Sequence, residues 1–237
     1  MHERDGEELK RQAALQAAER IRDGMVVGLG TGSTVRHLLE AIAERRSAGE
    51  LTTLHCIPTS RDTAARATRL GLPLASLATH PVVDLTIDGA DEVDPELNLI
   101  KGMGGALLRE KIVAAASRTR LIIVDGSKVV RLLGTRSALP VEVDPFGAAI
   151  QPPFLRALGA EPALRTNAAG EPYLTDGGNH IYDCRFPDGI DDPAALECAL
   201  NNRPGVIENG LFVGLADEVI IADGNGTRSI ERAAGKA

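Results

Sequence analysis

The 237-residue sequence has few cysteines and no long apolar run. Its three cysteines, Cys56, Cys184 and Cys198, are odd in number and form no CxxC motif, so we expect neither a disulfide framework nor a structural zinc site. We interpret Cys56 and Cys198 as small buried residues. The histidines form no HExxH motif, which argues against a histidine-based metal site. No membrane span or signal peptide is expected, because apolar stretches are short and residues 1–12 are polar.

Acidic residues outnumber basic ones, with 33 Asp and Glu against 26 Lys and Arg, so the formal net charge is -7. General nucleic-acid binding requires a basic face, so we expect no nucleic-acid partner. A small anionic substrate remains compatible with an acidic protein, because a few lysines and helix N-termini can bind a phosphate. The absence of a disulfide pattern is typical of a reducing compartment, and we expect a cytoplasmic protein.

Short apolar strands alternate with helices in the first part of the chain, which predicts an α/β fold with a mainly parallel, doubly wound sheet. The predicted strands are 25–29, 51–57, 72–77, 82–87 and 121–124, and the helices are 9–22, 35–46, 60–70 and 106–117. Residues 58–60 are expected to form a turn and the N-cap of the third helix. A different pattern follows, which predicts a smaller α/β domain with antiparallel strands at 136–212. Its predicted strands are 139–143, 161–165, 172–174, 180–185 and 206–213, with helices at 145–158 and 192–202. Residues 218–222 are predicted to rejoin the first sheet. The sheet domain is therefore predicted to consist of residues 1–135 and 213–237, and the smaller inserted domain of residues 136–212.

A glycine-rich loop, GLGTGST at 28–34, lies between a predicted strand and helix. Its backbone N–H groups and the helix N-terminus favour an anion, and Ser33 and Thr34 add hydroxyl groups. A dinucleotide loop would need glycine where Ser33 stands and an acid at the end of the next strand, where none occurs. The loop is therefore more typical of phosphate binding, with a tight structural turn as the alternative.

Two acids, Asp88 and Asp91, follow the strand at 82–87. Such a pair can bind a metal, bind hydroxyl groups or act in acid–base catalysis, and it can also be simple turn chemistry. Asp94, before a proline, is interpreted as a turn residue.

A third motif, KGMGGALLREK at 101–111, combines Lys101 with glycines expected to open a helix with exposed N–H groups. Glu110 then shares a helix face with apolar residues, and partial burial would suit it to act as a base. The alternative for Glu110 is an ordinary surface glutamate. Lys128 follows another predicted strand, and Lys10 is a weaker phosphate contact by spacing alone. Together these strand-end groups indicate a metal-free site for a phosphorylated polyhydroxy compound.

Four motifs, GLGTGST, IDGADEVD, KGMGGALLREK and VDGSK, closely resemble ribose-5-phosphate isomerase, type A. The resemblance extends from about residue 9 to residue 223. It implies a Rossmann-like sheet domain with an inserted, smaller ferredoxin-like domain, and a homodimer. It also implies interconversion of D-ribose 5-phosphate and D-ribulose 5-phosphate through an enediolate, without a metal or organic cofactor.

The resemblance further implies individual roles. Glu110 matches the catalytic base, and Asp88, Asp91 and Lys101 match polar groups around the reacting end of the sugar. The implied substrate-binding residues are Thr31, Gly32, Ser33, Thr34, Asp88, Gly89, Ala90, Asp91, Lys101, Gly102, Met103, Gly104 and Lys128. Met103 departs from the small residue common in the family, which affects the expected pocket shape more than the chemistry.

Two other classes share features of this pattern. A sugar-phosphate sensor domain, as in some transcriptional repressors, would not need the full set of acids, lysine and glutamate. The segment ahead of the first predicted helix is also too short for a helix-turn-helix. An amino-sugar-phosphate deaminase or a lactonase would be expected to place a histidine near the site. His80 is the histidine nearest in sequence, and it precedes its strand rather than following it.

Overall fold

The computed structural model describes residues 3–232, so residues 1–2 and 233–237 of the predicted first domain lie outside it. The chain forms two compact units. The first contains residues up to Ala90, Arg109–Lys128 and the segment from Gly214 on, and the second contains Asp91–Leu108 and Val129–Val213. The second unit therefore includes 91–108 and 129–135, which the sequence pattern groups with the sheet domain. The division into a domain and an insertion at 136–212 remains a prediction.

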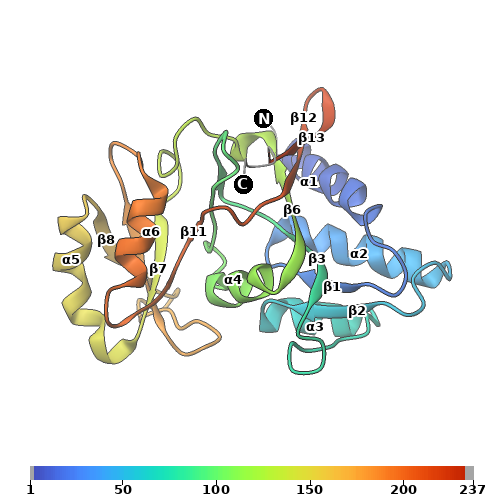
Figure 1. Ribbon diagram of the computed structural model, residues 1–237, viewed down its shortest axis with the longest axis horizontal. Helices are drawn as coiled ribbons and strands as arrows, with labels where there is room; N and C mark the ends of the chain where they lie inside the picture. The colour runs from blue at the N-terminus through green and yellow to red at the C-terminus, as the bar shows by residue number, and fades with distance from the viewer. Residues whose placement is uncertain (1–2, 233–237) are drawn as a thin grey trace. The chain divides into compact units, whose positions relative to one another are not determined.

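The first unit is built on a six-stranded sheet with the order β13-β12-β6-β3-β1-β2 (Figure 1). All neighbours pair in parallel except β13, which pairs antiparallel with β12 at one edge. The strands are β1 (Val26–Leu29), β2 (His55–Pro58), β3 (Val83–Asp88), β6 (Ser117–Asp125), β12 (Glu218–Asp223) and β13 (Gly226–Glu231). The mainly parallel sheet is thus confirmed, as is the return of 218–222 to it.

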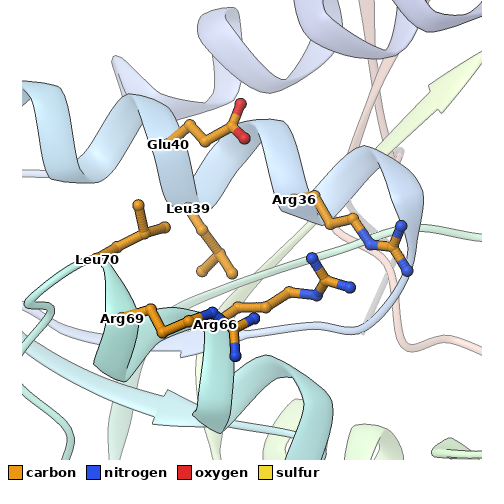
Figure 2. A pocket seen from close by; sticks show the side chains of 6 residues that line it. All are labelled: Arg36, Leu39, Glu40, Arg66, Arg69 and Leu70. Atoms are coloured by element: carbon orange, nitrogen blue, oxygen red, sulfur yellow. The ribbon is translucent and has the colours of Figure 1, made fainter.

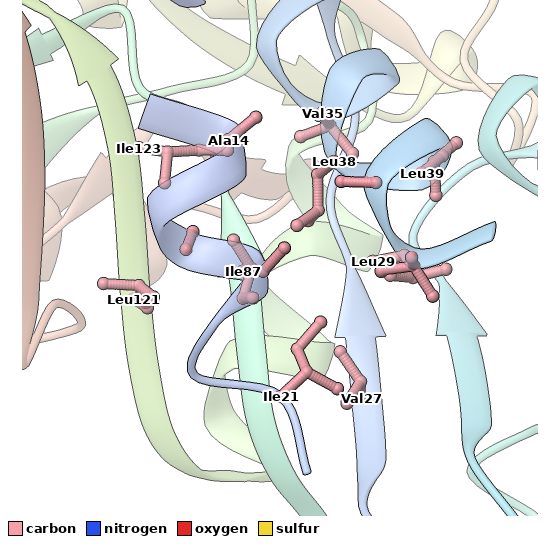
Figure 3. Packing of buried hydrophobic residues seen from close by; sticks show 14 of the residues in the cluster. Ala14, Ile21, Val27, Leu29, Val35, Leu38, Leu39, Ile87, Leu121 and Ile123 are labelled. Atoms are coloured by element: carbon pink, nitrogen blue, oxygen red, sulfur yellow. The ribbon is translucent and has the colours of Figure 1, made fainter. Parts of the chain in front are cut away.

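Helices cover both faces of this sheet. They are α1 (Glu3–Ala18), α2 (Ser33–Ser47), α3 (Arg61–Arg69) and the part of α4 (Leu107–Ala115) from Arg109 on, with a 3-10 turn, η1 (Gly126–Lys128). Figure 3 shows Ala14 and Leu38, from the first two helices, packing with Val27 and Ile87 of the sheet. Each fully buried Leu or Ile contributes about 1.5–3 kcal/mol through removal of apolar surface from water.

The opposite face of the sheet meets α4 closely. Val113 of this helix packs with Ile57 and Val83. Gly28 lies beneath it, and a Cβ there would overlap Val113 and the Thr86 hydroxyl. The glycine that opens GLGTGST therefore serves helix–sheet packing, in addition to the loop.

The second unit contains a four-stranded antiparallel sheet with the order β10-β7-β9-β8. Its elements are β7 (Leu139–Val143), η2 (Pro145–Ile150), α5 (Gln151–Ala157), β8 (Glu161–Leu164), β9 (His180–Arg185), α6 (Pro193–Asn201) and β10 (Val206–Asn209). This β-α-β-β-α-β sequence of elements is that of ferredoxin-like units, as expected. The predicted helix 145–158 is divided, because Pro152 and Pro153 lie at the start of α5, where their missing N–H groups cost least.

A small three-stranded sheet, β11-β5-β4, was not predicted. Its strands are β4 (Glu92–Val93), β5 (Leu99–Ile100) and β11 (Leu211–Phe212). The predicted strand 206–213 is interrupted at Gly210, where a Cβ would overlap the Lys101 carbonyl. The predicted strands 72–77 and 172–174 are wrong, since each is reduced to an isolated bridge at Leu74 or Pro172. Among the residues described, no helix has the length and apolar character needed to cross a membrane.

Candidate functional site

The carboxyl ends of the parallel strands place several predicted residues along one edge of the first unit's sheet. Leu29 of β1 pairs with Pro58 of β2 and Ile87 of β3, and Asp88 pairs with Ile122 of β6. The loops that follow these strands therefore begin at the same edge, which is where open α/β sheets bind ligands. They carry the glycine-rich loop, the first acid of DGADEVD and, after β6, Lys128.

Asp88 holds together the loops at this edge of the sheet. It is the last residue of β3 and only 4% exposed. Its Oδ1 accepts hydrogen bonds from the backbone N–H groups of Thr31 (3.1 Å) and Gly89 (2.7 Å). Gly30 leaves the space for this carboxylate, because a Cβ there would overlap it. The structure thus joins GLGTGST to DGAD through one carboxylate.

The hydroxyl group of Thr31 has a role that the sequence did not predict. Its Oγ1 lies 2.9 Å from the Oγ1 of Thr59, 2.9 Å from the Oγ of Ser60 and 3.3 Å from the Oγ1 of Thr63. Thr63 in turn donates to the Gly30 carbonyl (2.8 Å). This hydroxyl cluster ties the glycine-rich loop to the start of α3. Ser60 also caps that helix by accepting from the Thr63 N–H, as predicted.

The remaining loop residues present their groups to solvent to differing degrees. Gly32 and Ser33 are exposed, whereas Thr34 is half-buried. Gly32 has φ 127° and ψ 179°, a conformation that favours glycine, and it is the residue before the first turn of α2. The N-terminal N–H groups of that helix are suited to an anion such as a phosphate.

Glu110 is not a surface residue. It lies in the first turn of α4 and is 4% exposed, so the surface alternative is wrong. The apolar stripe that suggested partial burial is confirmed, because Leu107 and Ala114, which share a helix face with Glu110, are both buried. A buried carboxylate on a regular helix has a fixed position, which is what acid–base chemistry requires.

Lys128 and Lys10 have different surroundings. Lys128 is half-buried at the end of η1, directly after β6. Asp125, which ends β6, shapes this turn by accepting from the N–H of Ser127 (2.9 Å) and from its hydroxyl. Lys10 lies on α1, and its ammonium group donates to Glu7 at 2.6 Å. The structure therefore gives Lys128 a strand-end position and gives Lys10 an acidic neighbour on its own helix.

In the second unit, Lys101 is 3% exposed and follows β5 directly. Its backbone N–H donates to the Gly210 carbonyl at 2.9 Å. Its Nζ lies 5.3 Å from the centroid of the Phe212 ring, within cation–π distance. The small sheet that sequence reasoning missed therefore holds this lysine from both its main chain and its side chain.

Asp91 is attached to the same segment. Its N–H donates to the Ile100 carbonyl at 2.8 Å, and its Oδ2 accepts from the Met103 N–H at 3.1 Å. The Gly105 N–H donates to the Gly102 carbonyl at 2.9 Å. The expectation that the glycines open the helix with exposed N–H groups is thus wrong for Gly105, which lies in a tight turn before α4.

Met103 turns outward, with 47% of its surface exposed. Its sulfur lies 4.0 Å from the Nη2 of Arg165. Its backbone N–H is used by Asp91, as described, so the change from a small residue leaves this donor in place.

Two other acids of DGADEVD have structural roles. Glu92 is fully buried and accepts hydrogen bonds from the N–H groups of Gly134, Arg136 and Ser137. Asp94 is a turn residue, as predicted, since its side chain accepts from the N–H and the amide group of Asn98. Burial raises the pKa of Asp94.

A separate cavity of about 190 Å³ lies between α2 and α3 (Figure 2). Arg36, Arg66 and Arg69 line it beside the apolar Leu39 and Leu70, together with Glu40. None of the predicted site residues lines this cavity. Arg66 is already paired with Asp62 at 2.8 Å, and that acid and Glu40 offset part of the positive charge, so we assign no ligand to it.

Within residues 3–232, no group of three or more His, Cys, Asp or Glu side chains is arranged to hold a metal ion. Cys56 and Cys184 are buried, and burial raises the pKa of each thiol to about 12. Cys198 is exposed, which contradicts its interpretation as a buried residue. It lies on α6, from which Leu200 is buried in the core of the second unit and Leu196 packs against it.

Comparisons with known proteins agree with one another. Residues 55–226 match the family described as ribose 5-phosphate isomerase A (phosphoriboisomerase A). The ribose-5-phosphate isomerase A of Gloeobacter violaceus is 54% identical over 92% of this chain and 94% of its own. That of Desulfatibacillum aliphaticivorans is 49% identical over 95% of this chain and 97% of its own.

Solved structures give the same result. The ribose 5-phosphate isomerase from Plasmodium falciparum is 37% identical and superposes with a TM-score of 0.93, over 96% of this chain and 100% of the other. A D-ribose-5-phosphate isomerase in complex with phospho-erythronic acid is 41% identical, also with a TM-score of 0.93, over 96% of this chain and 99% of the other.

Proposed function

The chain belongs to the ribose 5-phosphate isomerase A family, and we propose that it carries out the family's reaction with the residues described above. It is an aldose–ketose isomerase that interconverts D-ribose 5-phosphate and D-ribulose 5-phosphate. We place this reaction in the non-oxidative pentose phosphate pathway. Family membership at this level of identity sets aside the sensor and deaminase alternatives.

The observation that best supports the assignment of roles is the burial of Glu110, at 4% exposed, on a helix that follows KGMGG. We propose that this carboxylate removes the C2 proton of the open-chain aldose and returns it to C1, while the C2 hydroxyl loses its proton and the C1 oxygen gains one, so that the C2 carbonyl of the ketose forms as the C1 carbonyl becomes a hydroxyl group. A single base can serve both carbons through a cis-enediolate, because C1 and C2 are adjacent and the proton stays on the same face.

The other residues are proposed to bind and activate the sugar. The phosphate is held by the loop from Thr31 to Thr34, by the N-terminus of α2 and by Lys128. Asp91, with Asp88, exchanges a proton with the ring or anomeric oxygen and so assists ring opening. Lys101 stabilises the negative oxygen of the enediolate, together with N–H groups in the Gly102–Gly104 segment.

Glu110→Gln tests the base directly. General acid–base catalysis contributes about 10²–10⁴-fold, so kcat for ribose 5-phosphate should fall by that factor while the fold is retained. Glu19→Gln is the matched control, because it makes the same change at an exposed position on the surface. Turnover by Glu110→Gln at the rate of this control would disprove the assignment.

Lys101→Met tests the oxyanion role. Phospho-erythronic acid, present in the solved relative, carries a carboxylate that resembles the oxygens of an enediolate. A hydrogen bond to a charged group contributes about 1.5–3 kcal/mol, so this acid should bind about 10–150-fold more weakly to the variant. Calorimetric titration measures this effect, and unchanged binding would remove Lys101 from the role.

We also propose that the reaction needs no metal or organic cofactor. Activity should then be the same before and after dialysis against EDTA. If the chelator abolished activity and a divalent cation restored it, Asp88 and Asp91 would be reinterpreted as ligands.

The remaining proposals concern the setting of the enzyme. We propose a cytoplasmic homodimer without a nucleic-acid partner. Phe146 and Ile150, on η2, are 101% and 60% exposed, and a second copy would offer cover for such apolar side chains. Light scattering should therefore give twice the mass of the 25.0 kDa chain. If Phe146 lies in the dimer contact, the Phe146→Glu variant should have the mass of one chain. A wild-type protein with the mass of one chain would refute the dimer.

A further inference from the structure

Arg165, which the sequence motifs did not single out, connects three parts of the second unit. It follows β8, and its side chain is 12% exposed. Its Nε and Nη2 form a two-pronged pair with the carboxylate of Asp183 on β9, at 2.9 and 2.5 Å. Its Nη1 donates to two consecutive carbonyl groups, those of Gly102 (3.2 Å) and Met103 (3.1 Å). One guanidinium group thus holds the KGMGG segment to the antiparallel sheet.

The geometry of this segment depends on close packing as well as on hydrogen bonds. Gly102 and Gly105 have φ values of 102° and 76°, in the region that favours glycine. A Cβ at Gly105 would overlap the hydroxyl and ring of Tyr173. The same ring lies 5.7 Å from the guanidinium carbon of Arg165, so Tyr173 packs on both the segment and the arginine.

Fixing these carbonyl groups also fixes the N–H groups that follow them. A peptide unit is planar and trans, so its C=O and the next N–H point in opposite directions. The bond from Arg165 to the Gly102 carbonyl therefore directs the Met103 N–H away from the arginine, and this N–H is the one that donates to Asp91 Oδ2 at 3.1 Å. By the same reasoning, the bond to the Met103 carbonyl directs the N–H of Gly104 away from Arg165.

We propose that Arg165, held by Asp183, is a positioning residue for the isomerase reaction. It orients two peptide planes, and through them the carboxylate of Asp91 and the N–H of Gly104. The inference rests on the proposed roles of Asp91 and Gly104. It explains why an arginine stands here, since a guanidinium can bind a carboxylate with one edge and carbonyl groups with another, which the point charge of a lysine cannot.

The expected effect is on turnover. Displacement of a reacting group by about 1 Å can reduce the rate about 10²-fold, so Arg165→Gln should lower kcat by about that factor. KM for ribose 5-phosphate should change little, because the proposed phosphate-binding groups lie on other segments. Arg165→Lys keeps the positive charge and should fall between the wild type and Arg165→Gln.

A structurally matched control is present in the first unit. Arg120 forms the same two-pronged pair with Asp217, at 2.8 and 2.7 Å, and neither residue is among the proposed site residues. Arg120→Gln should lower the thermal midpoint comparably and leave kcat unchanged. If Arg165→Gln behaves like this control, with reduced stability and normal kcat, Arg165 is only structural and the proposal is wrong.

A double-mutant cycle separates this inference from the proposed function. Asp91→Asn alone tests the role of Asp91, and a normal kcat in this variant would overturn both that role and the positioning through it. If Arg165 acts through Asp91, Arg165→Gln should reduce kcat much less in the Asp91→Asn background than in the wild type. Independent effects that multiply would overturn the positioning of Asp91 by Arg165 and leave only the Gly104 N–H as its target, with Asp91 still in its own role. Arg165→Lys extends the same cycle if Arg165→Gln fails to fold.

Discussion

Asp88→Asn separates the structural and chemical roles of one carboxylate. In the folded chain, Oδ1 of Asp88 accepts both the Thr31 N–H and the Gly89 N–H. The carbonyl oxygen of an asparagine can accept the same two bonds, and the side chain has nearly the same shape. The substitution removes the negative charge and the ability to accept a proton from the sugar, while the local framework remains.

The cost to stability can be worked out from these two bonds. A hydrogen bond to a charged acceptor contributes about 1.5–3 kcal/mol and one to a neutral acceptor about 0.5–1.5 kcal/mol. Loss of the charge therefore costs about 1–1.5 kcal/mol for each N–H, or about 2–3 kcal/mol for both. For a chain of this size, each kcal/mol lowers the thermal midpoint by about 2–4 °C, so a decrease of about 4–12 °C is expected.

The cost to activity should be much larger if Asp88 takes part in proton exchange. The kcat/KM for ribose 5-phosphate should fall by about 10²–10⁴-fold at a temperature where the variant is folded. An assay of ketose formation, run beside thermal unfolding, gives both quantities. A variant with the expected loss of stability but normal kcat/KM would show that Asp88 only holds the loop.

Gly30→Ala provides the opposite perturbation. A Cβ at Gly30 would overlap the carboxylate of Asp88, so the acid keeps its charge but must move. Overpacking of this kind costs about 1–3 kcal/mol. Activity should fall with an intact carboxylate, and normal activity here would show that the position of Asp88 is unimportant.

Two further predictions concern groups away from the proposed chemistry. Because burial raises the pKa of Cys56 and Cys184 to about 12, only the exposed Cys198 should react with a thiol reagent in the native protein, and all three cysteines should react after unfolding. Reaction of all three at equal rates before unfolding would contradict this. Burial acts to raise the pKa of Asp217, but hydrogen bonds from Arg120 and its charge outweigh it and hold the pKa below its usual value. This stabilisation is present above the unfolded pKa of about 3.9 and is lost as the pH falls through the lower folded pKa. Thermal midpoints measured from pH 6 down to the acid limit should therefore fall less steeply for Arg120→Gln, and equal slopes would contradict the pairing.

Periodicity predicted the elements whose burial is regular. The strand at 121–124 and the cap at Ser60 are local features, and both occur where expected. The predictions of strands at 72–77 and 172–174 were wrong because these segments contain apolar or β-favouring residues but have no neighbouring strand with which to form a ladder of hydrogen bonds. Leu74 and Pro172 each form only a single bridge.

The burial of Glu110 could not be read from its neighbours in sequence. Arg109 and Lys111 flank it and are typical of a solvated helix surface. Its 4% exposure depends on the packing of the helix against the sheet, including the contact of Val113 that requires glycine at position 28. That contact is long-range, so a local pattern carries only a hint of it. The likeness of KGMGGALLREK to a known family supplied what the physical pattern left open.

The groups that orient Asp88 and Asp91 were missed for a related reason. Both carboxylates accept hydrogen bonds from backbone N–H groups, and any residue except proline supplies such a donor. Sequence motifs consist of side chains, so they identify the two acids but not the backbone N–H groups that orient them. Backbone donors have one useful consequence: changing the acid to its amide leaves the donors in place. Loss of activity in Asp88→Asn or Asp91→Asn can then be attributed to charge and proton transfer. Loss of activity in Gly30→Ala or Arg165→Gln can be attributed to displacement of the Asp88 or Asp91 carboxylate. Together these variants separate the chemical role of each acid from the requirement for its position.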